Sequence, residues 1–563
     1  MLNNAVTLGV FRHRTFRVLW LCSLVSNIGA LIQLVAAAWL MTILSSSEGM
    51  VTLVQASVTL PIMLTALMAG VLADSFDRRK IMLVAQAFMM IVSIIMACLA
   101  FENLLSPWSL LAFTFLIGIG TALHYPSWQA SLREMVPRED LTSAVSVNAM
   151  GMNITRSMGP AIGGLIVAMV SPAAALAVNA LTYSAIIIAL IKWRPTVTCR
   201  QLPRERFHSA FAAGLRFFFM SPDLMVGTFR GCIFGFAAIS MQALSPLIAR
   251  KLLGGDATLY GVLLGAFGFG AVVGALMLGR LREALHNEII CRIGFILFSA
   301  CCLVVAFSTN TLVTVLAMFV AGFCWLSVVS LINVIVQLST PNWVLGRILA
   351  LYMTGLFGGM AAGSWVLGEI SETYSISTAF IAASAILIFG TTLGIRWPLS
   401  QRVDKNLNPL NQFNEPAIRL DLNRRSGPIM IMIEYTIDED DVVNFLETMA
   451  ECRRVRVRDG ARHWSLLRDI ENPELWIEAY HFPTWTEYKR HHERKTFSDS
   501  EVTERLKAFH RGNKPLRAHR MIGDVENLEA LAGMARAQQF LQDCREGVVR
   551  RHPPVGRRLA EHE

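Results

Sequence analysis

The chain has 563 residues, of which 54% are hydrophobic and 16% are charged, and its mean hydropathy is positive at +0.49. These values exclude an ordinary soluble globular protein. The net charge is +9, but residues 401–563 hold 27 basic and 27 acidic residues, so the whole surplus lies in residues 1–400. Because those basic residues occupy short segments between apolar runs, they indicate membrane topology rather than binding to nucleic acid.

A short arm, residues 1–17, precedes twelve apolar runs, each long enough to cross a hydrocarbon layer about 30 Å thick as a helix. The segment 193–222 separates six runs from six. We therefore expect a six-helix N-terminal bundle at 18–192 and a six-helix C-terminal bundle at 223–400. The expected spans are 18–44, 51–73, 80–101, 107–125, 141–169, 172–192, 223–249, 257–280, 288–308, 311–337, 347–370 and 377–396.

The loops alternate in their basic content. One set carries nearly all the Lys and Arg between the spans, whereas the other set offers Arg250 and Lys251. Basic loops stay in the cytoplasm, so we expect a multi-pass protein of the bacterial inner membrane with both termini cytoplasmic. Within the cytoplasmic linker 193–222, residues 207–217 are amphipathic at helical spacing, which is typical of a helix lying on the lipid surface.

The two sets of six spans align with each other at an offset of 204 residues. That offset places Pro137 on Pro341 and Arg78 on Arg282, and it also superposes Gly70 on Gly274, Gly159 on Gly363 and Gly164 on Gly368. Coincident Pro and Gly positions at one offset indicate an internal repeat, as in duplicated transporters.

After Trp397 about one third of the residues are charged, which predicts a soluble domain. Its pattern gives a strand at 429–435, a helix at 438–453, a hairpin of 461–468 and 475–481, a helix at 484–492 and a last strand at 516–522. This βαββαβ order predicts a small α+β ferredoxin-like domain over 417–522. Residues 523–563 are expected to be a helical and then basic tail.

The loop between the second and third spans reads Gly70-Val-Leu-Ala-Asp74-Ser-Phe-Asp-Arg78-Arg-Lys80. A Gly lets helices approach closely, an Asp can meet a facing helix N-terminus, and the Arg pair anchors the loop. The segment resembles the loop signature of the major facilitator superfamily, from which it departs at Ser75 and Asp77. The resemblance implies a twelve-helix fold of two bundles and assigns Gly70, Asp74 and Arg78 to conformational gating.

The fifth span contains Gly159-Pro160-Ala-Ile-Gly163-Gly164. Gly and Pro permit a bend and close packing where two halves of a transporter meet. The segment resembles an element typical of the antiporter branch of that superfamily, which favours export and adds these four Gly and Pro residues to the gating set. A kinked packing helix with no bearing on direction is the alternative.

Further segments, including residues 26–29, 136–141 and 263–274 and the tail residues 484–488 and 491–494, resemble the enterobactin-exporter-like subfamily, also called transmembrane secretion effectors. The resemblance covers residues 11–522. It implies a secondary active transporter, with a tail similar to the ferredoxin-like barrel of antibiotic-biosynthesis monooxygenases.

Ionisable residues are costly inside a membrane and therefore mark candidate sites. Arg156 and Arg230 lie well within apolar runs, and no Asp or Glu lies deep in any span. A cationic cavity would attract a small anionic or amphipathic molecule such as a siderophore, drug or metabolite. The coupling ion is expected to be a proton. Either Asp74, Glu369 or His124 near a membrane face holds it, or the coupling differs from the usual pattern of a carboxylate embedded in the membrane. The remaining cavity candidates are the amides Asn27, Gln33, Gln55, Asn333 and Gln337.

Two other functions stay open for the tail. It is either an enzyme domain that uses Trp464 and His481, or a regulatory module that dimerises. We expect no catalytic residue in the transporter, no cofactor and no metal, because the His and Cys residues lack ligand spacing and no phosphate-binding loop occurs.

Overall fold

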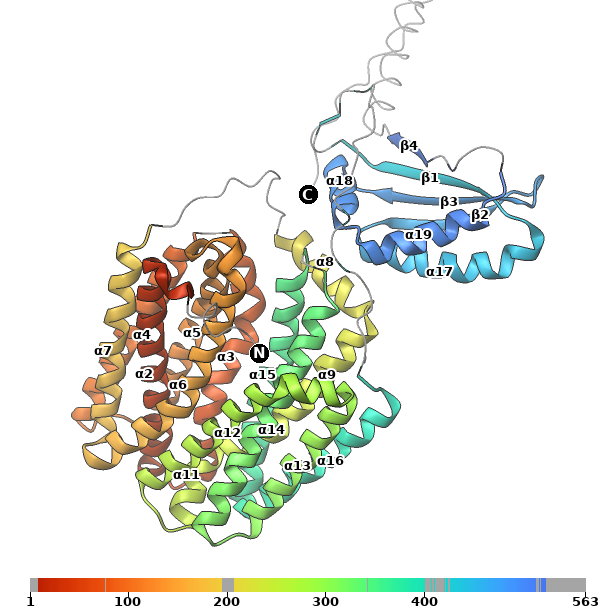
Figure 1. Ribbon diagram of the computed structural model, residues 1–563. Helices are drawn as coiled ribbons and strands as arrows, with labels where there is room; N and C mark the ends of the chain where they lie inside the picture. Colours follow the sequence, from red (N-terminus) through yellow and green to blue (C-terminus); the bar gives the residue numbers. More distant parts are fainter. Residues whose placement is uncertain are drawn as a thin grey trace, which may run out of the picture. The chain divides into compact units, whose positions relative to one another are not determined.

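The computed structural model describes residues 9–75, 77–194, 207–341, 343–399 and 426–512, together with 407, 410, 420, 422–423, 516 and 518–522. The chain divides into two compact units, Met1–Asn408 and Pro409–Glu563. The described part of the first unit is helical, and the second unit contains the sheet (Figure 1). The predicted tail 523–563 and the linker residues 195–206 lie outside the described residues.

The N-terminal half of the first unit begins with a short turn, η1 (Gly9–Arg12), and continues through six long helices. A second turn, η2 (Arg138–Asp140), precedes the fifth of them. The helices are α2 (Arg14–Leu44), α3 (Glu48–Ser75), α4 (Arg78–Phe101), α5 (Pro107–Met135), α6 (Leu141–Met169) and α7 (Pro172–Lys192).

The C-terminal half begins with α8 (Phe207–Phe219), the segment expected to be amphipathic. Its first long span is broken into four consecutive pieces, and five unbroken helices follow. The pieces are α9 (Pro222–Ala238), α10 (Ser240–Ala243), α11 (Ser245–Leu247) and η3 (Ile248–Leu252), and the helices are α12 (Ala257–Ala284), α13 (Asn287–Phe307), α14 (Thr311–Leu338), α15 (Leu345–Thr373) and α16 (Ile376–Arg396).

Among the described residues, eleven helical segments are long and apolar enough to cross a membrane. The twelfth long helix is α6, which has 29 residues and packs against α2 and α12. The expected fold of six plus six helices is therefore confirmed. Most helix ends differ from the expected spans by a few residues, whereas α5 continues ten residues beyond the expected end at 125.

The internal repeat is visible in local structure. Ser106 and Ser171 cap the N-termini of α5 and α7, and the residues 204 positions later, Asn310 and Ser375, cap α14 and α16 in the same way. Each cap satisfies backbone N–H groups that the first helical turn leaves without a partner. The same N-cap chemistry thus starts corresponding helices in both halves.

The glycines of the repeat make corresponding contacts. A Cβ added at Gly159 would meet Leu31 of α2, whereas one added at Gly363 would meet the backbone of α9. Likewise, Gly164 faces Gly261 of α12, and Gly368 faces Thr52 of α3. The two bundles therefore join along two related crossings, α6 with α12 and α3 with α15 (Figure 1).

The second unit has the predicted ferredoxin-like order. Its antiparallel sheet runs β2-β3-β1-β4, and Figure 1 shows α17 and α19 along one face. The helix expected at 484–492 is followed by a separate helix, because Thr496 and Asp499 form a capping box that starts a new one. The elements are β1 (Ile429–Thr436), η4 (Glu439–Asp441), α17 (Val442–Arg458), β2 (Arg462–Arg468), β3 (Leu475–Phe482), α18 (Trp485–Arg494), α19 (Phe497–Phe509) and β4 (Ala518–Ile522).

The crossing of α6 and α12 predicts a difference between two glycines of one helix. A Cβ at Gly268 would lie 2.7 Å from the Cα atom of Ser157, whereas a Cβ at Gly279 would meet nothing within 4 Å. We expect Gly268→Ala to lower the free energy of unfolding by about 1–3 kcal/mol, as overpacking does. Gly279→Ala should be neutral or stabilising because Ala favours helix. Thermal unfolding of both purified variants checks this, and equal midpoints would contradict it.

Candidate functional site

The loop that joins α3 and α4 ties together the ends of three helices. Arg78 donates to the carbonyl of Ala130 at 2.9 Å and to Glu134 at 2.7 Å, both in α5. Arg79 donates to the last carbonyls of α7, at Leu190 and Ile191. Cationic side chains at helix C-termini satisfy carbonyls that have no helical partner. The surroundings of Gly70 and the side chain of Asp74 are outside what the structure describes, so the gating role of both residues stays a prediction.

Asp77 explains one departure from the family signature. Its carboxylate accepts a hydrogen bond from the backbone N–H of Arg79 at 3.0 Å and caps α4. The N-terminal arm makes a related contact at the same end of the bundle. The side chains of His13 and Arg12 form hydrogen bonds with the carboxylate of Asp140, at 2.8 and 3.0 Å. These two hydrogen bonds lower the pKa of the Asp140 carboxyl. Arg12, Arg78 and Arg79 lie at this end together with Asp77 and Asp140, and we call it the basic end.

Arg156 lies in the middle of α6, yet its side chain is exposed. Among the described residues it makes no hydrogen bond or ion pair. Tyr125 of α5 lies close enough to interact with it electrostatically, and Gln129 donates to the Tyr125 hydroxyl at 3.1 Å. One helical turn before Arg156, Met152 contacts the amide of Asn27 on α2 at 3.8 Å. Among the described residues, Tyr125 is therefore the polar group that interacts with this unpaired cation, and Asn27 contacts α6 one helical turn away.

The other amide candidates separate into different environments. Gln33 is buried in a network in which its carbonyl accepts from Ser93 at 2.9 Å and from Asn179, so it joins α2, α4 and α7. Gln55 is buried in α3. On α14, Gln337 donates to Asn333 at 2.9 Å, and Gln337 is exposed. Of the amides, Asn27 is the one with a described contact to α6, at Met152, one helical turn before Arg156.

Arg230 differs from Arg156 in having a charged partner. It is 2% exposed and forms a buried ion pair with Glu288 of α13. Glu288 also accepts from Arg292 at 2.6 Å and from the backbone N–H of Leu399 at 2.8 Å. Sequence reasoning missed this carboxylate because it stands at the first turn of its span. Its spacing of four residues from Arg292 was the available signal.

Polar contacts at the opposite end of the unit join the two bundles. Glu48 of α3 pairs with Lys251 at 2.6 Å and also accepts from Ser371 of α15. Glu372 accepts from the hydroxyl of Ser47 at 2.5 Å and from the N–H of Gly49 at 2.9 Å. We call this set the clasp. It holds the start of α3 against the ends of α15 and η3.

In the second unit, the two residues named for an enzyme role lie apart. Trp464 donates at 3.0 Å to Glu478, which points with Tyr480 and Phe482 toward the helices. Because side chains alternate along a strand, His481 lies on the other face of β3. There its ring contacts that of His463, with 5.9 Å between the ring centroids. Among the described residues, no group of three or more His, Cys, Asp or Glu could hold a metal ion.

Comparison with known proteins identifies the family. The model of the transmembrane secretion effector family matches residues 5–528. The chain belongs to this family. It is 28% identical over 397 residues to the enterobactin exporter EntS of Escherichia coli O1:K1, covering 68% of this chain and 91% of the exporter. It is 23% identical over 330 residues to the staphyloferrin A transporter of Staphylococcus aureus, covering 57% and 80%.

A variant of the nucleoside transporter NupG has a similar solved structure. The TM-score is 0.58 at 11% identity, and the match covers 68% of this chain and 99% of that one. This likeness shows the fold. From its family and its relatives among transporters, this transmembrane secretion effector is a multi-pass membrane transporter of the major facilitator superfamily that moves a small molecule. Its family and its structural relatives are transporters rather than enzymes.

The buried ion pair of this transmembrane secretion effector predicts a stability effect. Removing Glu288 would leave Arg230 charged and buried without a partner, which costs about 3–5 kcal/mol. We expect Glu288→Ala to yield little folded protein and a strongly lowered thermal midpoint. Glu283→Ala removes an exposed carboxylate from the end of α12 and should change stability by less than about 0.5 kcal/mol. Similar midpoints for the two variants would refute the role of the ion pair.

Proposed function

We propose that this transporter is an efflux antiporter for a small anionic or amphipathic molecule, such as a siderophore, drug or metabolite. The observation that carries the proposal is Arg156, an exposed cation in the middle of a spanning helix with no ion-pair partner among the described residues. An uncompensated cation in a site of low dielectric constant attracts a substrate that bears carboxylate, phosphate or catecholate groups. Asn27, Tyr125 and Gln129 supply hydrogen-bonding groups around it.

The similarity to the enterobactin exporter and to the staphyloferrin A transporter supports a siderophore-like cargo. The Gly-Pro element in α6 supports outward transport. We propose a proton as the coupling ion, with Asp74, Glu369 and His124 as its candidate acceptors. Of these, His124 contacts Gln86 at 3.3 Å inside the N-terminal bundle, and Glu369 is exposed on α15.

We further propose that the protein lies in the bacterial inner membrane with its basic end and both termini in the cytoplasm, following the Lys and Arg content of the loops. In this orientation the clasp closes the outer side. The described contacts then correspond to a state that loads cargo from the cytoplasm, as export requires, and the bundles must rock about the two glycine crossings to release it.

For Arg156, we expect Arg156→Gln to lower export of an anionic cargo about tenfold or more while the amount of protein in the membrane stays normal. Loss of one charge-assisted contact has an effect of this size. Retention of enterobactin, staphyloferrin A and other candidate compounds is measured in a deletion strain that carries each variant. Arg156→Lys should keep part of the activity, and Arg396→Gln, which removes an exposed arginine at the end of α16, should keep all of it.

Equal retention of every compound with and without the gene would contradict export itself. Full export by Arg156→Gln would instead contradict only the role of the arginine. The two parts of the proposal therefore fail separately.

The clasp predicts rescue by exchange of charges. Glu48→Lys or Lys251→Glu alone places like charges together and should lower transport about two- to fivefold, because a partly exposed pair contributes only about 0.2–1 kcal/mol. The double variant Glu48→Lys with Lys251→Glu restores opposite charges and should recover most of the rate. Initial transport rates in the same strain measure this, and a double variant no better than the singles would refute the pairing as a gate.

A further inference from the structure

The sheet of the second unit has one face in the core and a second face rich in Met and His. Ile431 of β1 and Tyr480 and Phe482 of β3 are buried in the core that α18 helps to form. Because side chains alternate along a strand, Met430 and His481 lie on the opposite face. Both are only partly buried. We call the side of the sheet that carries Met430 and His481 the Met–His face.

Four soft donors stand in one row across this face. The register places Met430 of β1 opposite His481 of β3 on one side and opposite Met521 of β4 on the other. The ring of His463, from β2, contacts that of His481 with 5.9 Å between the centroids. Neighbouring strands lie about 4.8 Å apart, a distance that long side chains bridge. Each strand therefore contributes one imidazole or thioether, and we call these four residues the donor row.

An irregularity in β2 brings His463 into the row. The pairing of β2 with β3 shifts between Arg462, which is opposite His481, and Ser465. Regular alternation from Arg462 would turn His463 toward the helices. Instead His463 has a φ of 51°, a conformation uncommon outside glycine, and its ring lies against His481. Bulges re-aim side chains in this way, often beside functional sites. Arg462 is exposed, so its charged end can stay in water.

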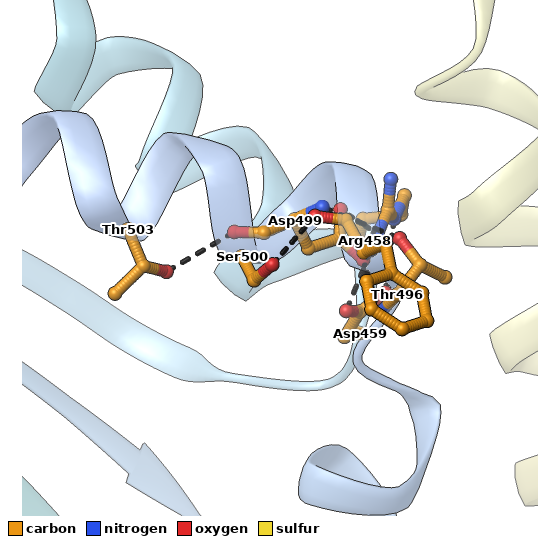
Figure 2. A network of polar contacts seen from close by, with 7 residues as sticks. Arg458, Asp459, Thr496, Asp499, Ser500 and Thr503 are labelled. Carbon is orange, nitrogen blue, oxygen red and sulfur yellow. Dashed lines mark hydrogen bonds and ion pairs between the residues drawn. The ribbon is translucent and has the colours of Figure 1, made fainter. Parts of the chain in front are cut away.

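His481 has a ring atom that the fold does not use. Its Nδ1 atom is buried and has no hydrogen-bond partner among the described residues. Where α17 meets α19, by contrast, polar groups are paired, since Asp499 accepts from Arg458 at 2.9 Å and from the hydroxyl of Thr496 at 2.7 Å (Figure 2). A buried polar atom without a partner calls for an explanation. A neutral imidazole offers one nitrogen lone pair, which a metal ion can accept.

We propose that the donor row binds one soft metal cation, Cu(I), through His463, His481 and Met430, with Met521 beside them. Thioether sulfur selects Cu(I) among the biological metals, and imidazole also binds copper. All four donors are neutral, which suits a cation of single charge. With two imidazoles and two thioethers, the row differs from the groups of three or more His, Cys, Asp or Glu that the described residues lack. The site does not depend on the transport function proposed above.

Competition for Cu(I) between the full-length protein in detergent and the chelator bicinchoninate, without oxygen, tests the site. Cysteine thiols are first blocked with N-ethylmaleimide, because thiolates also bind Cu(I). We expect one Cu(I) per chain. His481→Phe, Met430→Leu and His463→Gln should each weaken binding at least about tenfold, since even loss of a residue that supports a metal ligand costs about 10–100-fold in affinity. His463 is exposed, so its replacement leaves the fold intact.

Met432→Leu is the matched control. Met432 lies on the same face of the same strand, but it stands opposite Ala479 and His519, so its replacement should leave binding unchanged. Thermal midpoints without metal verify that each variant is folded. The absence of saturable binding, or unchanged binding by Met430→Leu and His463→Gln, would overturn the proposal. An equal loss in Met432→Leu would overturn the assignment to the donor row, and Zn(II) binding as tight as that of Cu(I) would overturn the preference for a soft cation.

Discussion

The close approach of backbones at the two glycine crossings is the constraint on which the transporter depends. Helices in lipid gain little from hydrophobic burial against one another, so their association relies on van der Waals contact and on polar groups. Gly268 meets the backbone of Arg156 and Ser157, and Gly164 meets Gly261. Because glycine has no side chain beyond a hydrogen atom, the two bundles touch at these points without interdigitating side chains. The clasp then adds a few exchangeable polar contacts at one end.

The two halves of the repeat share their packing features but not the arginines inside their spans. Helix caps and glycine contacts recur at the offset of 204, because both halves solve the same packing problem. The arginines inside the spans do not recur. Arg156 corresponds to Met360, and Arg230 corresponds to Ser26. Packing residues are therefore shared by both halves, whereas each arginine inside a span belongs to one half only.

The comparison of Arg156 with Arg230 shows where sequence reasoning ends. Both arginines stand inside apolar runs and give the same signal along the chain. The structure separates them through a residue 58 positions away, Glu288, which pairs with Arg230 and leaves Arg156 without a charged partner. Span number, repeat and sheet order follow from periodicity and could be predicted. Pairing across helices depends on how each helix is rotated, which hydropathy does not specify.

In the second unit, too, the sequence does not specify which polar residues pair with each other. The strands and α17 follow from alternation and from the acidic residues at the start of that helix. The sequence pattern predicts no helix between residues 492 and 516, however, where the capping box of Thr496 and Asp499 starts α19. The bonds that occupy Asp499 and Glu478 could not be read from residue type, because the unit holds many basic and acidic residues. Only the fold decides which of them are paired.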